Sequence, residues 1–395
     1  MNKIRVALVG VGIMGSKYAQ MIVTGMVKNM VLTGVVARKQ TAKEWAAALV
    51  NTDGMSPQVY NSTEEMYEHP DDFDAVLIVT PHKSHEEIAL RAFALGKHVL
   101  CDKPAGATIG QAQRMTAASK EADRVYGMVF HQHGYPKYKY IKELLERGEF
   151  GEIKRMLAVN SRYFRTAHYH TLGSWRSSWN GEGGGALINQ GAHILDIWQW
   201  FFGMPKKIYA DIPFGKYNHF KVDDEATIQM RYANGATGTF IISTGEAVAK
   251  ERLEAVGTKG SFLLDGDTLH ICKYSKDSQE YLETEIAFSS EKLEITEEVI
   301  EFEKAAEPYI EILENFAEAA LSNNPSLLIA PGEDAVHQLM LTNAAYYSAW
   351  KDMPVELPLN AAVYEEALKE KCSEEERYVS DESGIPEQDR KYIKK

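Results

Sequence analysis

The first 130 residues alternate between short apolar runs and longer segments whose apolar positions recur with a helical spacing. The runs are rich in Val, Ile and Leu and show no polar face, which is typical of strands covered by helices on both sides. We expect strands at Ile4–Val9, Val31–Val36, Ala75–Val79, His98–Cys101 and Val125–Phe130. We expect helices between them at Ser16–Thr24, Ala42–Leu49, Ser84–Leu95 and Ile109–Glu121. The pattern predicts a doubly wound parallel α/β domain over residues 1–130.

From residue 131 onward the pattern changes to helices followed by segments in which apolar and polar residues alternate. Alternation predicts strands with one covered face, here at Met156–Tyr163, Lys207–Ile212, Ala226–Tyr232, Thr237–Ser243, Arg252–Val256, Ser261–Leu264 and His270–Tyr274. Helices are expected at Lys137–Arg147, Gly185–Phe202, Tyr309–Leu321 and Gly332–Trp350. We therefore expect an α+β domain with a large open mixed or antiparallel sheet over residues 131–360. The charged extension over residues 361–395 is interpreted as a surface tail or a segment that contacts a partner.

Composition narrows the classes of function. The chain has 395 residues and a net charge of −13, so its acidic surface repels phosphate backbones and we expect no nucleic-acid partner. Three distant cysteines indicate neither a disulfide framework nor a cysteine zinc site. We see no signal-peptide pattern and no apolar stretch long enough to span a bilayer. We therefore expect a cytoplasmic protein that has no membrane partner.

A glycine-rich turn follows the first predicted strand and opens the first predicted helix. In such a turn the first glycine allows the bend, the second lets a pyrophosphate approach, and the third lets helix and strand pack closely. The helix N-terminus adds amide donors. The context predicts dinucleotide binding, against the simpler alternative of a plain glycine turn. The expected cofactor contacts are Gly10, Gly12, Ile13, Met14 and Gly15.

The end of the second predicted strand bears on the choice of cofactor. The carboxylate that usually binds the ribose 2′-hydroxyl there is replaced by Ala37, Arg38 and Lys39. Two cations favour a 2′-phosphate, although Arg38 could instead stack on an adenine, and a solvated basic edge is the simple alternative. We expect NAD or NADP, with a slight preference for NADP, and dual use stays open.

Five further motifs occur in order along the chain: Thr80–His85, Cys101–Ala105, Phe130–His133 with Pro136, Gly183–Asp196, and Pro354–Leu357. In this order the chain resembles the glucose–fructose oxidoreductase / inositol dehydrogenase / MocA (Gfo/Idh/MocA) family over about Lys3 to Leu357. The resemblance implies a Rossmann domain and a C-terminal domain whose open sheet often packs in homodimers or homotetramers. It also implies nicotinamide-dependent oxidation or reduction of a secondary alcohol, usually on a sugar or cyclitol. Some members retain the cofactor and cleave glycosides.

The resemblance and the residue chemistry together indicate Lys103, His193 and Asn189 as catalytic residues. Asn189, His193 and Asp196 are spaced i, i+4, i+7, so we expect them on one helix face. A neutral imidazole is suited to take the hydroxyl proton as hydride leaves, and Lys103 would stabilise the developing alkoxide. Lysine as the base stays open. The resemblance implies Glu where Asp102 stands, and often Asp where Asn189 stands. The amide at Asn189 moves the interpretation toward glycoside or amino-sugar branches.

The remaining expected contacts surround these residues. Cofactor contacts are expected from Thr80, Pro81, His82, His85, Asp102, Lys103 and His131. Aromatic faces suit sugar rings, and arginines bind hydroxyls or an anionic substituent. The expected substrate contacts are Lys103, His131, Tyr163, His168, Trp175, Arg176, Asn189 and His193. No carboxylate cluster completes a ligand set around the two His-x-His pairs, so we expect no metal site.

Three functions remain open from the sequence. The leading hypothesis is an NAD(P)-dependent oxidoreductase that acts on a secondary alcohol of a sugar, glycoside or cyclitol. The second is a redox-neutral enzyme with tightly bound NAD, which oxidises C3 of a glycoside, eliminates the aglycone and returns the hydride. Its second base would be Tyr163, His168, Tyr169 or His170. The third is a non-catalytic nucleotide-sensing module.

Overall fold

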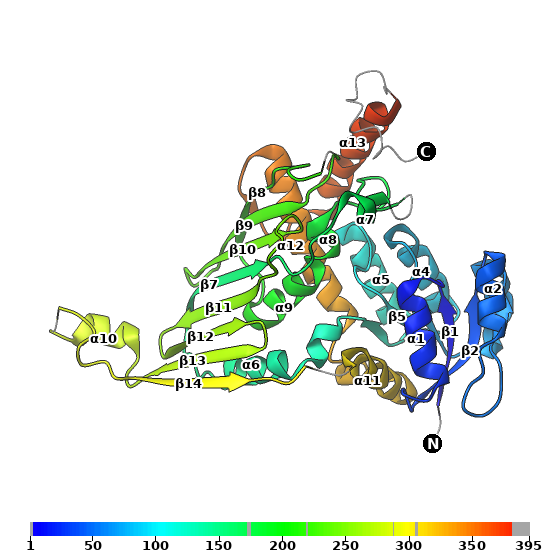
Figure 1. Ribbon diagram of the computed structural model, residues 1–395, viewed down its shortest axis with the longest axis horizontal. Helices are drawn as coiled ribbons and strands as arrows, with labels where there is room; N and C mark the ends of the chain where they lie inside the picture. The colour runs from blue at the N-terminus through cyan, green and yellow to red at the C-terminus, as the bar shows by residue number, and fades with distance from the viewer. Residues whose placement is uncertain (1–2, 172–174, 219, 287, 305–306, 381–395) are drawn as a thin grey trace. The chain divides into compact units, whose positions relative to one another are not determined.

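The computed structural model describes residues 3–171, 175–218, 220–286, 288–304 and 307–380 (Figure 1). The chain forms two compact units. One comprises residues 1–134 and 306–339, and the other comprises residues 135–305 and 340–395. The first unit thus includes a late segment that the hydrophobic pattern alone assigns to the second domain.

The first unit contains a six-stranded sheet with the order β3-β2-β1-β4-β5-β6. All neighbouring strands pair in parallel. The strands are β1 (Ile4–Val9), β2 (Met30–Val36), β3 (Gln58–Tyr60), β4 (Ala75–Ile78), β5 (His98–Cys101) and β6 (Tyr126–Met128). This order confirms the predicted doubly wound domain, and its topological switch point lies between β1 and β4, where such sheets bind dinucleotides.

Side-chain caps mark the start of two helices of the first unit. The Thr108 side chain and Gln111 form a capping box at the start of α5, and Ser62 accepts the Glu65 amide at the start of α3. The helices are α1 (Ile13–Val23), α2 (Gln40–Ala47), α3 (Thr63–Glu68), α4 (His85–Ala94), α5 (Ile109–Glu121) and α11 (Pro308–Ser322). Short 3₁₀ turns are η1 (Pro70–Asp72), η2 (His82–Ser84), η3 (His131–Gly134) and η4 (Pro325–Leu327).

The second unit contains a nine-stranded sheet with the order β14-β13-β12-β11-β7-β10-β9-β8-β15. β7 and β10 pair in parallel, whereas the other neighbouring strands pair antiparallel. The strands are β7 (Ile153–Asn160), β8 (Lys207–Asp211), β9 (Glu225–Arg231), β10 (Thr237–Ser243), β11 (Glu251–Gly257), β12 (Gly260–Asp265), β13 (Thr268–Tyr274), β14 (Ile295–Glu301) and β15 (Val355–Glu356). The predicted mixed open sheet is confirmed.

Helix α9 supplies much of the apolar cover of this unit, because Ile194, Leu195, Ile197 and Trp198 are all buried. The helices are α6 (Pro136–Glu146), α7 (Ala167–Thr171), α8 (Ala186–Asn189), α9 (Ala192–Phe202), α10 (Ser278–Thr284) and α13 (Ala361–Ser380), while α12 (Gly332–Lys351) belongs partly to each unit. Within the described residues we find no helix that combines the length and the apolar character needed to cross a membrane.

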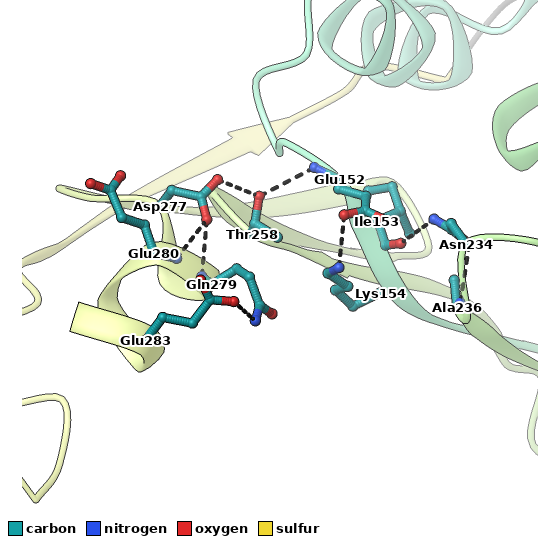
Figure 2. Close-up of polar contacts among 10 residues, drawn as sticks. All are labelled: Glu152, Ile153, Lys154, Asn234, Ala236, Thr258, Asp277, Gln279, Glu280 and Glu283. Carbon is teal, nitrogen blue, oxygen red and sulfur yellow. Dashed lines mark hydrogen bonds and ion pairs between the residues drawn. The ribbon is translucent and has the colours of Figure 1, made fainter. Parts of the chain in front are cut away.

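The segment that carries α10 between β13 and β14 (Figure 1) is anchored by polar contacts at its base (Figure 2). The Thr258 hydroxyl donates to Asp277 Oδ2 at 2.7 Å and accepts the Glu152 amide at 3.2 Å. Asp277 Oδ1 accepts the Gln279 amide at 2.9 Å and thereby caps α10. The hydrogen bond from Thr258 lowers the pKa of Asp277. The segment is therefore joined to the sheet by a hydrogen-bonded carboxylate.

The C-terminal segment corrects one expectation, because residues 361–380 form helix α13 instead of a surface tail. The Tyr364 ring is buried and stacks on Trp350 at 5.5 Å, and Trp350 stacks on Tyr346 at 5.9 Å. The Glu375 carboxylate accepts the backbone amides of Trp179, at 3.1 Å, and of the next residue, at 2.9 Å. This helix is therefore part of the second unit. Residues 381–395 lie outside the described residues.

Candidate active site

The glycine turn between β1 and α1 has the geometry of a dinucleotide loop. Gly10 has φ +109°, and a Cβ there would lie 2.5 Å from the Val79 carbonyl oxygen. A Cβ at Gly15 would lie 1.9 Å from the Gly10 carbonyl oxygen, whereas one at Gly12 would meet no described atom within 4 Å. The side chain of Ile13 is 87% exposed beside this open space. The bend and the close packing thus require the first and third glycines, and the second leaves room for a ligand at the helix N-terminus.

The edge beyond β2 carries the two predicted cations. Ala37 is buried, and its amide donates to the Tyr60 carbonyl at 2.9 Å. Arg38 and Lys39 are exposed, and neither forms an ion pair within the part of the chain that the structure describes. Both cations are therefore available to an anionic group near this edge.

His85 connects the loops that follow β4 and β5. Its Nε2 lies 2.6 Å from the Thr80 carbonyl oxygen, and its Nδ1 lies 2.9 Å from the Pro104 carbonyl oxygen. The ring is buried, and burial lowers its pKa. His82 is also buried, whereas Pro81 is half-buried. Both ring nitrogens of His85 thus face backbone carbonyls, so the side chain joins these two loops, and its predicted contact with the cofactor stays a prediction.

Asp102 and Lys103 follow β5 at the carboxyl end of the parallel sheet, where open α/β sheets bind ligands. Asp102 Oδ1 accepts the Lys103 backbone amide at 2.9 Å. Burial raises the pKa of Asp102 to about 6, and the Lys103 ammonium opposes that rise. The Lys103 side chain is half-buried, and its peptide bond to Pro104 is cis. Lys103 thus directly follows a carboxyl group whose pKa is raised by burial.

His131 belongs to an aromatic cluster that sequence reasoning missed. The buried His131 ring stacks on Tyr309 of α11 at 4.3 Å. Tyr309 also lies 5.5 Å from the Tyr18 ring of α1 and beneath the Lys17 ammonium at 4.6 Å. Residues from three distant parts of the chain therefore meet here within the first unit. No local pattern signals this contact, because Tyr309 lies 178 positions after His131 (309 − 131 = 178).

The predicted helix over residues 185–202 is divided into α8 and α9. The Gly191 amide donates at 2.8 Å to the carbonyl five residues earlier, which is the wide turn of a π-type bulge. Asn189 ends α8, whereas His193 lies in the first turn of α9 and Asp196 is fully buried. The expectation that these three side chains share one face of a continuous helix is therefore wrong.

A buried carboxylate orients Asn189. Glu182 is 2% exposed, accepts the Ser177 amide at 2.6 Å and accepts a hydrogen bond from Asn189 Nδ2. An ionised carboxylate is only an acceptor, so the amide nitrogen of Asn189 must face it. Asn189 Oδ1 therefore lies on the other side of the amide, as an acceptor. Glu182 was missed by sequence reasoning, although a carboxylate beside a triple glycine is a visible signal.

The loop before α8 forms a cluster of arginines and aromatic rings. The Tyr169 hydroxyl accepts from Arg176 Nη1 at 2.9 Å and from Gln190 Nε2 at 3.1 Å. The Arg165 guanidinium lies 4.2 Å from the Tyr169 ring centroid and 5.1 Å from that of Tyr163. Gln190 lies between α8 and α9. Tyr169 therefore joins the loop to the bulge between the predicted catalytic residues, a function that sequence reasoning did not give it.

The other predicted substrate contacts of this loop differ in exposure. Tyr163 is half-buried next to Arg165, and Trp175 lies 4.6 Å below the Arg176 guanidinium. His168 is exposed on α7. The structure thus gathers Tyr163, Trp175 and Arg176 into the cluster and leaves His168 on its exposed side.

Two family models match the chain. One, described as "Oxidoreductase family, NAD-binding Rossmann fold", matches residues 4–130. The other, described as "GFO/IDH/MocA C-terminal domain", matches residues 138–263. The matches include the glycine turn and Lys103 in the first range, and Asn189 and His193 in the second.

Curated relatives are similar over part of their length. Trans-1,2-dihydrobenzene-1,2-diol dehydrogenase of Bos taurus is 27% identical over 206 residues, which are 52% of this chain and 58% of the relative. The chain thus spans little more than half of that relative. Levoglucosan dehydrogenase of Pseudarthrobacter phenanthrenivorans is 27% identical over 297 residues, which are 67% of this chain and 74% of the relative.

A solved structure shows the same fold. The WlbA dehydrogenase from Bordetella pertussis, in complex with NADH and UDP-GlcNAcA, superposes with a TM-score of 0.73 at 22% identity. The superposition covers 91% of this chain and all of that one. The similarity therefore extends over both sheets.

Proposed function

The chain belongs to the Gfo/Idh/MocA oxidoreductase family, and we propose on this basis that it transfers a hydride between NAD(P) and a secondary alcohol of a sugar, glycoside or cyclitol. The observation that carries the proposal is the open glycine turn at the β1–β4 switch point, together with Lys103 at the end of β5. Relatives named as dehydrogenases of levoglucosan and of a cyclic diol support the substrate class.

In the proposed reaction Lys103 and His193 both act on the alcohol group of the substrate. Bound nicotinamide supplies the hydride acceptor. His193 takes the hydroxyl proton, and Lys103 donates a hydrogen bond to the same oxygen and stabilises its developing negative charge. Asn189, oriented by Glu182, accepts a hydrogen bond from a neighbouring hydroxyl of the substrate. Tyr163, Trp175 and Arg176 bind the rest of the sugar.

The test is a substrate screen with purified protein and both cofactors. Sugars, glycosides and cyclitols are offered with NAD⁺ or NADP⁺, and the absorbance of reduced nicotinamide is followed. Formation of reduced cofactor with a member of this set supports the proposal. Failure with every member, while NAD(P) still binds, would favour a nucleotide-sensing module.

A second candidate is the redox-neutral cleavage of glycosides with retained NAD. It is favoured by Asn189, an amide at a position where the family resemblance implies a carboxylate, and by the hydroxyl of Tyr169 in the loop before α8. Chromatography of glycosides after incubation separates the two candidates. Aglycone release without net reduced cofactor supports the second, and a keto product formed with reduced cofactor supports the first.

The cofactor preference gives a prediction for the β2 edge. We propose that Arg38 and Lys39 bind the 2′-phosphate of NADP, and we expect the double substitution to alanine to raise the KM for NADP about tenfold to a hundredfold. This range corresponds to about 1.5–3 kcal/mol for hydrogen bonds to a charged group. The KM for NAD should change little. Lys43→Ala is the control, because Lys43 lies on helix α2, which begins directly after this edge. Equal effects on both cofactors would contradict the assignment.

We also propose that the chain assembles as a homodimer or homotetramer, as the family resemblance implies. Light scattering coupled to size-exclusion chromatography measures the mass of the particle, which is then compared with the 44.3 kDa of one chain.

A further inference from the structure

Asp223 is a buried carboxylate that the proposed reaction does not use. It lies two residues before β9 and is 1% exposed. Its Oδ1 accepts the Gly185 amide at 2.8 Å, and its Oδ2 accepts the Leu187 amide at 2.6 Å. Its own carbonyl oxygen accepts the Ala186 amide at 3.0 Å. Three consecutive amides at the start of α8 therefore bond to this one residue, and α8 ends at Asn189.

Tyr346 of α12 completes the contact. Its hydroxyl donates to Asp223 Oδ1 at 2.6 Å, and its ring is fully buried. The ring stacks on Trp350 at 5.9 Å and meets the edge of Trp179 at 5.1 Å. Aromatic packing thus fixes the Tyr346 ring. Its hydroxyl adds a fourth hydrogen bond to the three that Asp223 accepts from backbone amides.

The triple glycine before α8 fits this contact. A Cβ on Gly185 would lie 1.9 Å from the Asp223 carbonyl oxygen. Gly184 has φ +150°, and a Cβ there would lie 2.3 Å from the Tyr346 hydroxyl. Side chains at these two positions would therefore separate the carboxylate and the phenol from the start of α8.

The low intrinsic stability of α8 favours a positioning role for Asp223. A helix of four residues has almost no stability of its own, so external contacts must fix its place. Burial raises the pKa of Asp223 to about 6, whereas the Tyr346 hydroxyl and the α8 amides act in the opposite direction. A buried carboxylate is costly unless it is hydrogen-bonded, and two of the donors that stabilise this one, the amides of Gly185 and Leu187, lie at the start of α8.

We propose that Asp223, together with Tyr346, is a positioning pair that fixes α8 and, through the bulge at Gly191, the first turn of α9. Asn189 and His193 are thereby held at the alcohol, so this inference rests on the proposed function of those two side chains. Asp223 contacts backbone amides and the Tyr346 hydroxyl and takes no part in proton transfer.

The neighbouring carboxylate is a matched control. Asp224 is also fully buried and accepts the amides of Tyr217 and Asn218, both at 2.8 Å, and of Lys216 at 3.1 Å. It therefore fixes the loop before β9 instead of α8. Asp223→Asn and Asp224→Asn remove the same charge one residue apart, so they separate positioning of α8 from general stability.

The experiment compares these variants in the full-length protein with the best substrate from the screen. Asp223→Asn turns an amide donor toward backbone donors, so α8 shifts, and we expect kcat to fall about a hundredfold, the effect of a displacement of about 1 Å. NAD(P) affinity, measured by binding, should stay unchanged. Asp224→Asn should lower the unfolding midpoint similarly but retain kcat within about threefold, because the hydrogen bonds of Asp224 hold the loop before β9 and not α8. If Asp223→Asn does not fold, Tyr346→Phe, which removes one donor, should still lower kcat about fivefold.

The outcomes distinguish failure of the positioning role from failure of the proposed function. Asp223→Asn or Tyr346→Phe with unchanged kcat and pH profile, beside an inactive His193→Asn, would overturn only the positioning role. An active His193→Asn would overturn the proposed function itself. Equal losses of kcat in Asp223→Asn and Asp224→Asn would assign both residues to general stability and would also overturn the inference.

Discussion

Replacing His193 with asparagine is expected to lower kcat/KM about 10²–10⁴-fold, the usual contribution of a general base. The side chain lies in the first turn of α9, next to the bulge that separates it from Asn189. Asparagine keeps a polar group of similar size but cannot take a proton from the alcohol. Binding of NAD(P) belongs to the first unit and should persist. Steady-state kinetics and cofactor titration measure the two effects separately.

The control for this substitution is His270→Asn, because His270 is an exposed histidine on β13 of the same unit. It should leave kcat/KM within about twofold, as surface substitutions usually have small effects. Retention of activity in His193→Asn would exclude the imidazole as the base and would leave Lys103 as the candidate.

Replacing Lys103 with methionine is expected to lower kcat about 10²–10³-fold, the usual cost of removing one donor to a developing oxyanion. Methionine retains the length of the side chain and removes the charge. Because the Lys103 ammonium opposes the raised pKa of Asp102, the pKa of that carboxyl should rise further in the variant. Kinetics across pH 5–8, with cofactor affinity measured in parallel, report both changes.

Lys97→Met is the matched control, since Lys97 immediately precedes β5 whereas Lys103 follows it. It lies at the end of the strand opposite the switch-point loops and should leave kcat unchanged within about twofold. A wild-type kcat in Lys103→Met would remove the lysine from the proposed reaction.

The parallel sheet could be predicted because its strands are continuous apolar runs between helical patterns. β4, for example, is buried at all four positions. β3 was missed because Gln58–Tyr60 is short and begins with an exposed polar residue. β14 was missed because nearly all of its side chains are exposed, so no alternation marks it. Helix α13 carries a weak signal, since its buried Tyr364, Ala367 and Leu368 recur at helical spacing within a charged segment.

The candidate site was predictable where its signal is local. The glycine turn combines strand, bend and helix within a few residues. Asp223 could not be found in this way, because its phenolic partner Tyr346 lies 123 positions later. The bulge at Gly191 was also hidden, since the apolar pattern continues across it as it would in an unbroken helix.

The interleaved course of the chain limits how its halves can be produced separately. Ending the polypeptide at residue 134 would delete α11, and with it the Tyr309 ring that covers His131. A recombinant nucleotide-binding fragment should instead join residue 134 to the segment 306–339 through a flexible linker, so that α11, η4 and the first part of α12 are retained. Exchange of halves between relatives likewise requires three coordinated crossover points, after residues 134, 305 and 339.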